Sequence, residues 1–112
     1  MRKTIADEKI HKGAALVMSA YHPDVISEVE KAVASHEWVI VGMAQNPIVK
    51  KARGILDARK TKYHYIQYGS YFSAWKQRLA IKLWSGWPTF PQVFHKGILI
   101  GGAQDLEKYL GV

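Results

Sequence analysis

Residues 87–106, WPTFPQVFHKGILIGGAQDL, contain the signals that decide the fold of this chain. The glycine and proline of SGWPTF, residues 85–90, predict that the preceding helix ends there. PQVFHKGILIGG predicts two strands joined by a tight turn at His95, Lys96 and Gly97. Residues 104–110 predict a short final helix. We therefore expect a hairpin followed by a helix at this end of the sequence.

Upstream of this stretch, the hydrophobic pattern predicts a helix, a central strand and a second helix. Residues 22–37, HPDVISEVEKAVASHE, have apolar residues at helical spacing. Residues 38–43, WVIVGM, form a short apolar run rich in β-branched residues, which is typical of a strand covered on both faces. The following NPIVKKARGIL predicts a helix with Asn46 as its N-cap and Pro47 as its first residue.

A further strand and helix are predicted between residues 61 and 84. TKYHYIQY, residues 61–68, alternates as a strand does. Ser70 is a suitable N-cap for a helix through residues 71–84, YFSAWKQRLAIKLW. The resulting order is helix, β-α-β, helix, β-β, helix, which indicates an α/β sandwich with a mixed sheet.

The length and composition indicate a single domain. The 112 residues, 48% of them hydrophobic, suffice for one core and are too few for two. We expect one domain over residues 1–112, with residues 1–13 as a mobile N-terminal arm because they carry mixed charge and little periodicity. No stretch approaches the roughly 18 to 20 apolar residues of a membrane span, and the first residues lack a secretory signal pattern. We expect a soluble, cytoplasmic protein with no membrane partner.

The sequence contains no cysteine and carries a formal net charge of +7. The absence of thiols excludes disulfides, thiolate catalysis and clusters ligated by the protein's own sulfur. Between residues 38 and 104, ten lysines and arginines accompany one acid, Asp57. This charge favours anionic partners, and it equally fits a solvated basic surface without a specific partner.

Two other classes of site find little support in the sequence. The five histidines are scattered without metal-ligand spacing, so we expect no metal site. The aromatic segment YHYIQYGSYFSAW, residues 63–75, could stack bases in a basic groove. We instead expect Tyr63, Tyr65, Phe72 and Trp75 to be core or half-buried residues, and we do not expect nucleic acid as a partner.

Three segments together resemble the glutaredoxin family. WPTFPQVFHKGILIGGAQDL resembles the WPTxPQ stretch with a downstream Gly-Gly of monothiol glutaredoxins, and RLAIKLWSGWPT matches the basic and serine spacing that precedes it there. NPIVKKARGIL lies over the segment where that branch has Cys-Gly-Phe-Ser and dithiol relatives have Cys-Pro-x-Cys. The resemblance covers about residues 38–110. It implies a thioredoxin-like, three-layer α/β sandwich with a four-stranded mixed sheet flanked by helices.

The resemblance also implies a glutathione-binding groove. Its residues would be Asn46, Arg78, Lys82, Phe90, Pro91, Gly102, Ala103 and Gln104. In the family the proline at Pro91 is cis and turns the backbone of the preceding residue, here Phe90, toward the ligand.

Both carboxylates of glutathione would be bound in this groove. Arg78 and Lys82, four residues apart and thus on one helical face, would face the glycyl carboxylate. The γ-glutamyl carboxylate would lie at the start of the last helix, after Gly101 and Gly102, where a helix N-terminus attracts anions.

The departures from the family pattern bear on function. Asn46 occupies the position of the catalytic cysteine, Val49 that of the second thiol, and Met43 that of a preceding lysine. Thiol-disulfide exchange needs an attacking thiolate, and iron-sulfur clusters are ordinarily held by thiolates. We therefore expect no catalytic residue and no metal.

The sequence leaves three functions in contention. The first is a noncatalytic glutaredoxin-like module that retains a groove for glutathione or another small anion, with no cofactor required. The second is a protein-interaction module that uses the same groove or the exposed aromatics, with an unknown protein partner. The third is a redox or iron-sulfur-related glutaredoxin, which would need a cysteine in the natural chain that is absent here.

Overall fold

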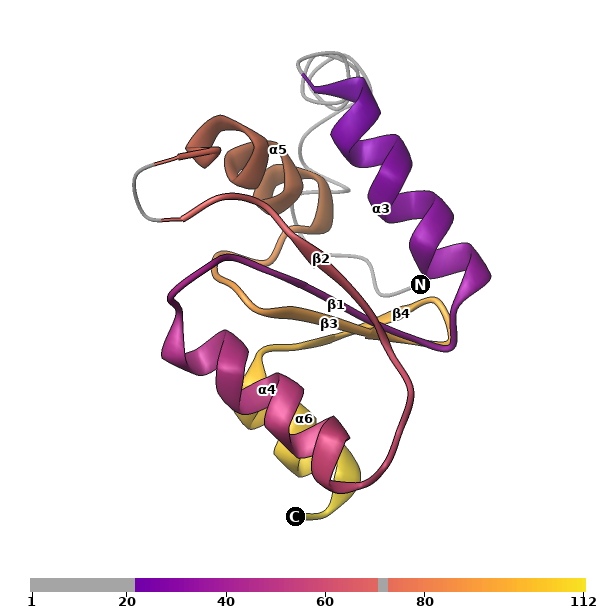
Figure 1. Ribbon diagram of the computed structural model, residues 1–112. Coiled ribbons are helices and arrows are strands. Elements are labelled where there is room, and N and C mark those ends of the chain that lie inside the picture. Colours follow the sequence, from indigo (N-terminus) through magenta and orange to yellow (C-terminus); the bar gives the residue numbers. More distant parts are fainter. Residues whose placement is uncertain (1–21, 71–72) are drawn as a thin grey trace.

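The computed structural model describes residues 22–70 and 73–112, so the mobile arm predicted for residues 1–13 lies outside the described residues. Within these described residues, four helices and four strands follow one another in the order predicted from the sequence (Figure 1). They are α3 (Pro23–Ser35), β1 (Trp38–Gly42), α4 (Pro47–Ala58), β2 (His64–Gln67), α5 (Trp75–Ser85), β3 (Gln92–His95), β4 (Ile98–Gly101) and α6 (Ala103–Leu110).

The strands form one mixed sheet in the order β2-β1-β3-β4. β1 pairs in parallel with β2 and antiparallel with β3, and β3 pairs antiparallel with β4. All five residues of β1 are buried, which explains its continuous apolar run because a central strand covered on both faces has no solvent side. This is the thioredoxin-like α/β arrangement.

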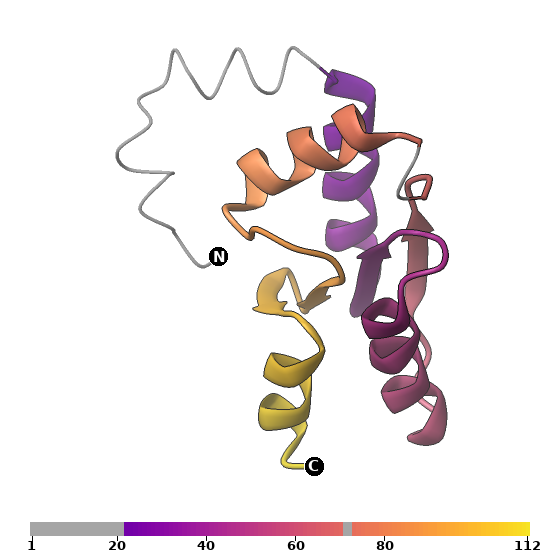
Figure 2. The same ribbon diagram turned by 90° about the vertical axis from the view of Figure 1, so that its left-hand side faces the viewer.

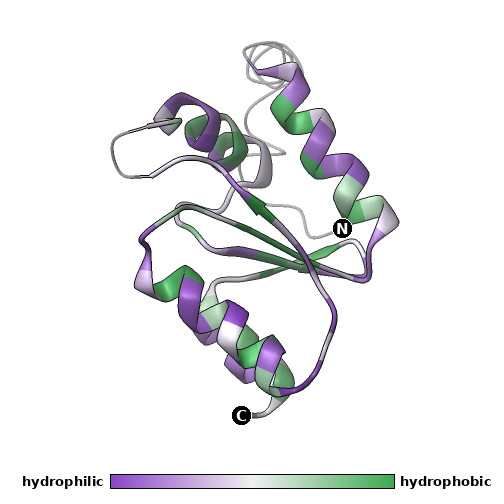
Figure 3. Ribbon diagram, viewed as in Figure 1, coloured by the Kyte–Doolittle hydropathy of each residue, from purple (hydrophilic) through white to green (hydrophobic). Residues whose placement is uncertain are grey.

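The helices cover the two faces of the sheet in pairs. α3 contacts α5 and α4 contacts α6, and Figures 1 and 2 show the two pairs on opposite sides of the strands. Along these helices hydrophobic and hydrophilic residues alternate in patches, as amphipathic helices require (Figure 3).

Each face of the sheet has its own hydrophobic core, because successive side chains of β1 point to opposite faces. Val39 and Val41 pack with buried residues of α3 and α5, such as Val29 and Ile81. Ile40 packs on the other face with residues of α4 and α6, including Leu56 and Leu106.

The hairpin predicted at residues 91–102 is confirmed. Lys96 and Gly97, with φ of 51° and 81°, form the turn between β3 and β4. Positive φ at both central residues gives the tight turn whose twist matches the flanking strands. The final helix is also confirmed and begins at Ala103, one residue earlier than predicted.

Ser70 is not the N-cap of α5, and this prediction was wrong. The helix begins at Trp75, after Ala74 at φ 58° and ψ 24°. Ser70 and Ser73 instead bond to each other, since the Ser73 N–H donates to the Ser70 carbonyl and the Ser70 N–H donates to the Ser73 hydroxyl. This local turn uses the serine groups that would otherwise cap a helix.

The prediction of core or half-buried aromatics holds for some residues only. Tyr63 and Tyr65 are half-buried, whereas Trp75, at the first position of α5, is 57% exposed. Phe72 lies outside the described residues. Among the helices that the structure describes, none is long and apolar enough to cross a membrane.

Candidate functional site

The start of α4 is closed by the side chain of Asn46. Its Oδ1 accepts hydrogen bonds from the backbone N–H groups of Ile48 and Val49, at 2.9 and 3.0 Å. Pro47 has no N–H, and the Lys50 N–H donates to the Asn46 carbonyl. The donors that a helix N-terminus offers to an anion are therefore engaged by the chain itself.

The peptide bond between Phe90 and Pro91 is cis, as the resemblance implied. Phe90 is buried and packs in the same core cluster as Met43 and Val49, from the segments before and after Asn46. The ammonium group of Lys82 lies 5.9 Å from the centre of the Phe90 ring. The start of α4, the start of β3 and the end of α5 thus converge.

The start of α6 forms the remaining part of the predicted groove. Gly101 has φ of +126°, and a Cβ there would lie 2.8 Å from the Asp105 carboxyl group, so only glycine fits. A Cβ on Gly102 would lie 3.8 Å from the Pro91 carbonyl oxygen and 3.9 Å from the indole nitrogen of Trp87. Gly102 thus places the start of α6 beside the cis-proline.

The first turn of α6 already contains a carboxylate. The Gly102 N–H donates to Oδ2 of Asp105 at 3.0 Å. Of the other predicted residues here, Ala103 is buried and Gln104 is exposed. An incoming carboxylate would therefore have only the following N–H groups available and would lie close to a negative charge.

Arg78 has a different environment from the one that the resemblance implied. Its side chain is buried, at 7% exposure, although Lys82 on the same helix is half-buried. One terminal nitrogen donates to the carbonyl groups of Tyr68 and Ser73, at 2.9 and 2.6 Å. Through these hydrogen bonds, Arg78 links the segment between β2 and α5 to α5.

A second groove, which was not predicted from the sequence, lies between α4 and β2. It has a volume of about 460 Å³, and its lining includes Asn46, Lys50, Arg53, Tyr65 and Gln67. The signal available in the sequence was the pair Lys50 and Arg53, which three-residue spacing places on one helical face. Burial of the Tyr65 phenol raises its pKa, so Tyr65 is uncharged at neutral pH.

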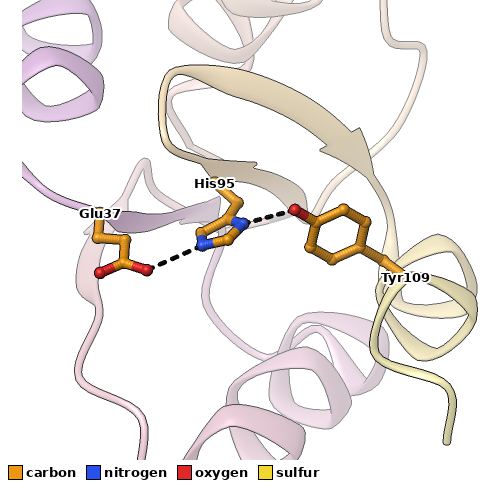
Figure 4. Close-up of polar contacts among 3 residues, drawn as sticks. All are labelled: Glu37, His95 and Tyr109. Atoms are coloured by element: carbon orange, nitrogen blue, oxygen red, sulfur yellow. Dashed lines mark hydrogen bonds and ion pairs between the residues drawn. The ribbon is translucent and has the colours of Figure 1, made fainter.

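A third group of polar side chains lies at the opposite end of the sheet (Figure 4). His95 is 3.0 Å from Glu37 through Nε2 and 2.7 Å from the Tyr109 hydroxyl through Nδ1. A neutral imidazole that donates its Nε2–H to Glu37 can accept the Tyr109 proton at Nδ1. The ring also stacks on Trp38 at 3.9 Å. The group joins β1, β3 and α6.

We predict that Glu37 contributes to stability at neutral pH and loses this contribution in acid. The hydrogen bond from His95 lowers the pKa of Glu37 below its ordinary value of 4.5. The stabilisation is therefore present above that value and disappears as pH falls through the lowered folded-state pKa. Urea denaturation gives the free energy of unfolding of wild type and of Glu37→Gln between pH 3 and pH 6. The difference between the two proteins should shrink as pH falls.

Tyr109→Phe serves as the control, because it keeps the ring beside Trp38 and removes the hydroxyl. The difference in free energy of unfolding between Tyr109→Phe and wild type should persist at low pH. A Glu37→Gln difference that stays constant over this range would show that the carboxylate contributes nothing through its charge.

The histidines form no metal-binding group among the residues that the structure describes. His36 and His64 stack at 4.4 Å, and His95 belongs to the group in Figure 4. Because the whole sequence lacks cysteine, the chain supplies no thiolate for an iron-sulfur cluster either.

Comparison with known proteins agrees with this geometry. A "Glutaredoxin-like protein" of Dictyostelium discoideum is 51% identical over 90 residues, which cover 80% of this chain and 73% of that protein. The chain belongs to the glutaredoxin family. "Glutaredoxin 3" of Danio rerio is 40% identical to this glutaredoxin-like chain over 71 residues. The matched segment covers 62% of this chain and 21% of that relative. Profiles of known protein families give no match.

Solved glutaredoxin structures support the fold. Wheat glutaredoxin superposes with a TM-score of 0.68 at 21% identity, over 80% of this chain and 85% of that one. A buckwheat glutaredoxin-glutathione complex superposes with a TM-score of 0.66 at 20% identity, over 80% of this chain and 82% of that one. Oxidized glutaredoxin 2 from Chlamydomonas reinhardtii superposes with a TM-score of 0.66 at 25% identity, over 80% of this chain and 86% of that one. These likenesses establish a thioredoxin-like glutaredoxin fold in a chain without cysteine.

Proposed function

We propose that this protein is a noncatalytic glutaredoxin-like module that binds glutathione, or a similar small carboxylate, in a residual groove. The observation that carries the proposal is the Asn46 cap at the start of α4. Oδ1 of Asn46 accepts the Ile48 and Val49 N–H groups at the position where the resemblance places a cysteine. An amide cannot attack a disulfide, so the site holds a ligand without exchanging electrons with it.

The groove retains several features suited to a peptide-like anion. Lys82 offers a cation beside Phe90, and Pro91 is cis. Gly102 brings the start of α6 close to the Pro91 carbonyl. A neighbour with the same fold was solved as a glutaredoxin-glutathione complex, which supports glutathione as the ligand to test first.

Other features weaken the affinity of this groove. Met43 is apolar and buried, Arg78 is engaged with two carbonyl groups, and Asp105 lies at the start of α6. Lys82 is thus the cation on which a glycyl carboxylate depends. We expect a dissociation constant around millimolar, which corresponds to about 4 kcal/mol.

The test is a glutathione titration followed by tryptophan fluorescence, because Trp87 lies beside Gly102. Wild type should saturate in the millimolar range. Lys82→Gln should bind about fivefold more weakly, the effect of one partly exposed charge pair. Lys76→Gln, on the same helix, is the matched control and should bind as wild type does. Equal affinities in all three proteins would remove the groove as the binding site.

Protein interaction is the second candidate function, and one observation favours it. Trp75, Leu79 and Leu83 follow one another at four-residue spacing on α5 and are all exposed. Lys76 and Lys82 flank this apolar stripe, so the face is complementary to an acidic amphipathic helix. If glutathione did not bind, protein interaction would be the better supported of the two functions.

A further inference from the structure

We propose that the groove between α4 and β2 binds a small organic anion of the phosphate monoester class, at a site separate from the glutathione groove. The groove encloses about 460 Å³, a volume suited to a small ligand. It lies on the β2 side of β1, whereas Phe90 and Pro91 precede β3 on the other side. The two grooves share only the segment around Asn46.

Arg53 is positioned for recognition of an anion. Its guanidinium group lies 3.9 Å over the Tyr65 ring, and its Nε–H donates to the Tyr63 hydroxyl at 3.2 Å. This hydrogen bond raises the pKa of Arg53, so the charge is permanent. Among the described residues, Arg53 forms no ion pair, and its hydrogen bonds are made with the hydroxyl groups of Tyr63 and Tyr65. Its positive charge therefore has no carboxylate partner. The planar guanidinium group, held in place by the two tyrosines, matches the geometry of phosphate oxygens.

The charged side chains that line the groove are both positive. They are Lys50 and, one helical turn later, Arg53, and no carboxylate of the described residues lines the groove. Asp57, one turn further along α4, attracts Arg53 but forms no ion pair with it. The N–H groups at the start of α4 are already capped by Asn46, so the attraction depends on the side chains and not on the helix terminus.

The groove also offers surface for the organic part of the ligand. Val49 and Met43 are buried at its base, and the half-buried Tyr65 forms part of its wall. Gln67 and Gln45 add amide groups that can donate or accept. An anion attached to a planar or apolar group would use both kinds of lining, whereas free phosphate would use only the cations.

Phenyl phosphate is the probe, added to the full chain and followed by amide chemical shifts, with inorganic phosphate and phenol as comparison ligands. Shifts should centre on Lys50, Arg53 and Tyr65. Lys50→Gln should weaken binding at least fivefold, and Arg53→Lys, which keeps the charge but loses the fork, should do the same. Lys51→Gln is the matched control, because Lys51 pairs with Glu107 on another side of α4.

Three outcomes decide the proposal. The proposal is supported if phenyl phosphate binds more tightly than phosphate and phenol, and if only the Lys50 and Arg53 variants lose affinity. The melting temperatures of these variants should be unchanged. Equal weakening in Lys51→Gln would show diffuse attraction to a basic surface and overturn the proposal, as would absence of saturable binding. Lys82→Gln separates the two sites, since it should reduce glutathione binding and leave phenyl phosphate binding intact.

Discussion

Asn46→Cys should convert a chain that cannot react with glutathione disulfide into one that forms a mixed disulfide at neutral pH. In wild type, Oδ1 of Asn46 occupies the Ile48 and Val49 N–H groups, and the chain has no thiol. In the variant, these donors and the α4 dipole would stabilise a thiolate, lowering its pKa below the ordinary value of about 8.5. The thiolate attacks one sulfur of oxidised glutathione and releases the other half as reduced glutathione.

Mass spectrometry after incubation with oxidised glutathione measures this gain directly. Asn46→Ser is the matched control, because a hydroxyl caps the helix but cannot form the mixed disulfide. Loss of the better cap should cost the cysteine variant about 1 kcal/mol of stability. Wild type should show no glutathione-dependent disulfide reductase activity. A folded Asn46→Cys protein that remains unmodified would show that this junction is not a glutaredoxin site without its thiol.

Arg78→Met should lower the free energy of unfolding by about 2 to 4 kcal/mol, the largest loss that we expect from any residue of the predicted groove. The substitution leaves the carbonyl groups of Tyr68 and Ser73 without the donor that bonds them at 2.9 and 2.6 Å. Since the guanidinium group is buried, water does not readily replace it. Urea denaturation gives the size of the loss.

Lys82→Met provides the comparison on the same helix. Its ammonium group lies 5.9 Å from the centre of the Phe90 ring and forms no ion pair with a described residue, so its removal should change stability by less than about 0.5 kcal/mol. If Arg78→Met proved as stable as Lys82→Met while glutathione binding was lost, Arg78 would be a ligand-binding residue after all.

The sequence predicted the order of elements because each has a local signal. Asn46 and Pro47 mark the start of α4, and Lys96 and Gly97 mark the hairpin turn. The start of α5 could not be predicted in this way. Ala74 adopts a positive φ that its residue type does not favour, and the turn is held by Arg78, a contact between segments that local propensity does not contain.

The candidate site could be predicted only in part, for a similar reason. Motifs in the sequence placed Pro91 and Gly102 near one ligand, and the structure brings them together. The burial of Arg78 depends on the packing of α5 against the segment after β2, and the groove at Arg53 depends on the packing of α4 beside β2. Spacing along a helix shows that two cations share a face, but not whether that face meets solvent or a neighbouring segment.

Amide chemical shifts of the wild-type chain, recorded during a glutathione titration, show whether the groove at Lys82 and Gly102 binds this ligand. We expect fast-exchange, millimolar binding with the largest shifts at Lys82, Phe90, Gly102 and Gln104, and no covalent product after long incubation with oxidised glutathione. Saturating glutathione that shifts only residues of the α4 and β2 groove, or no residue at all, would contradict this expectation.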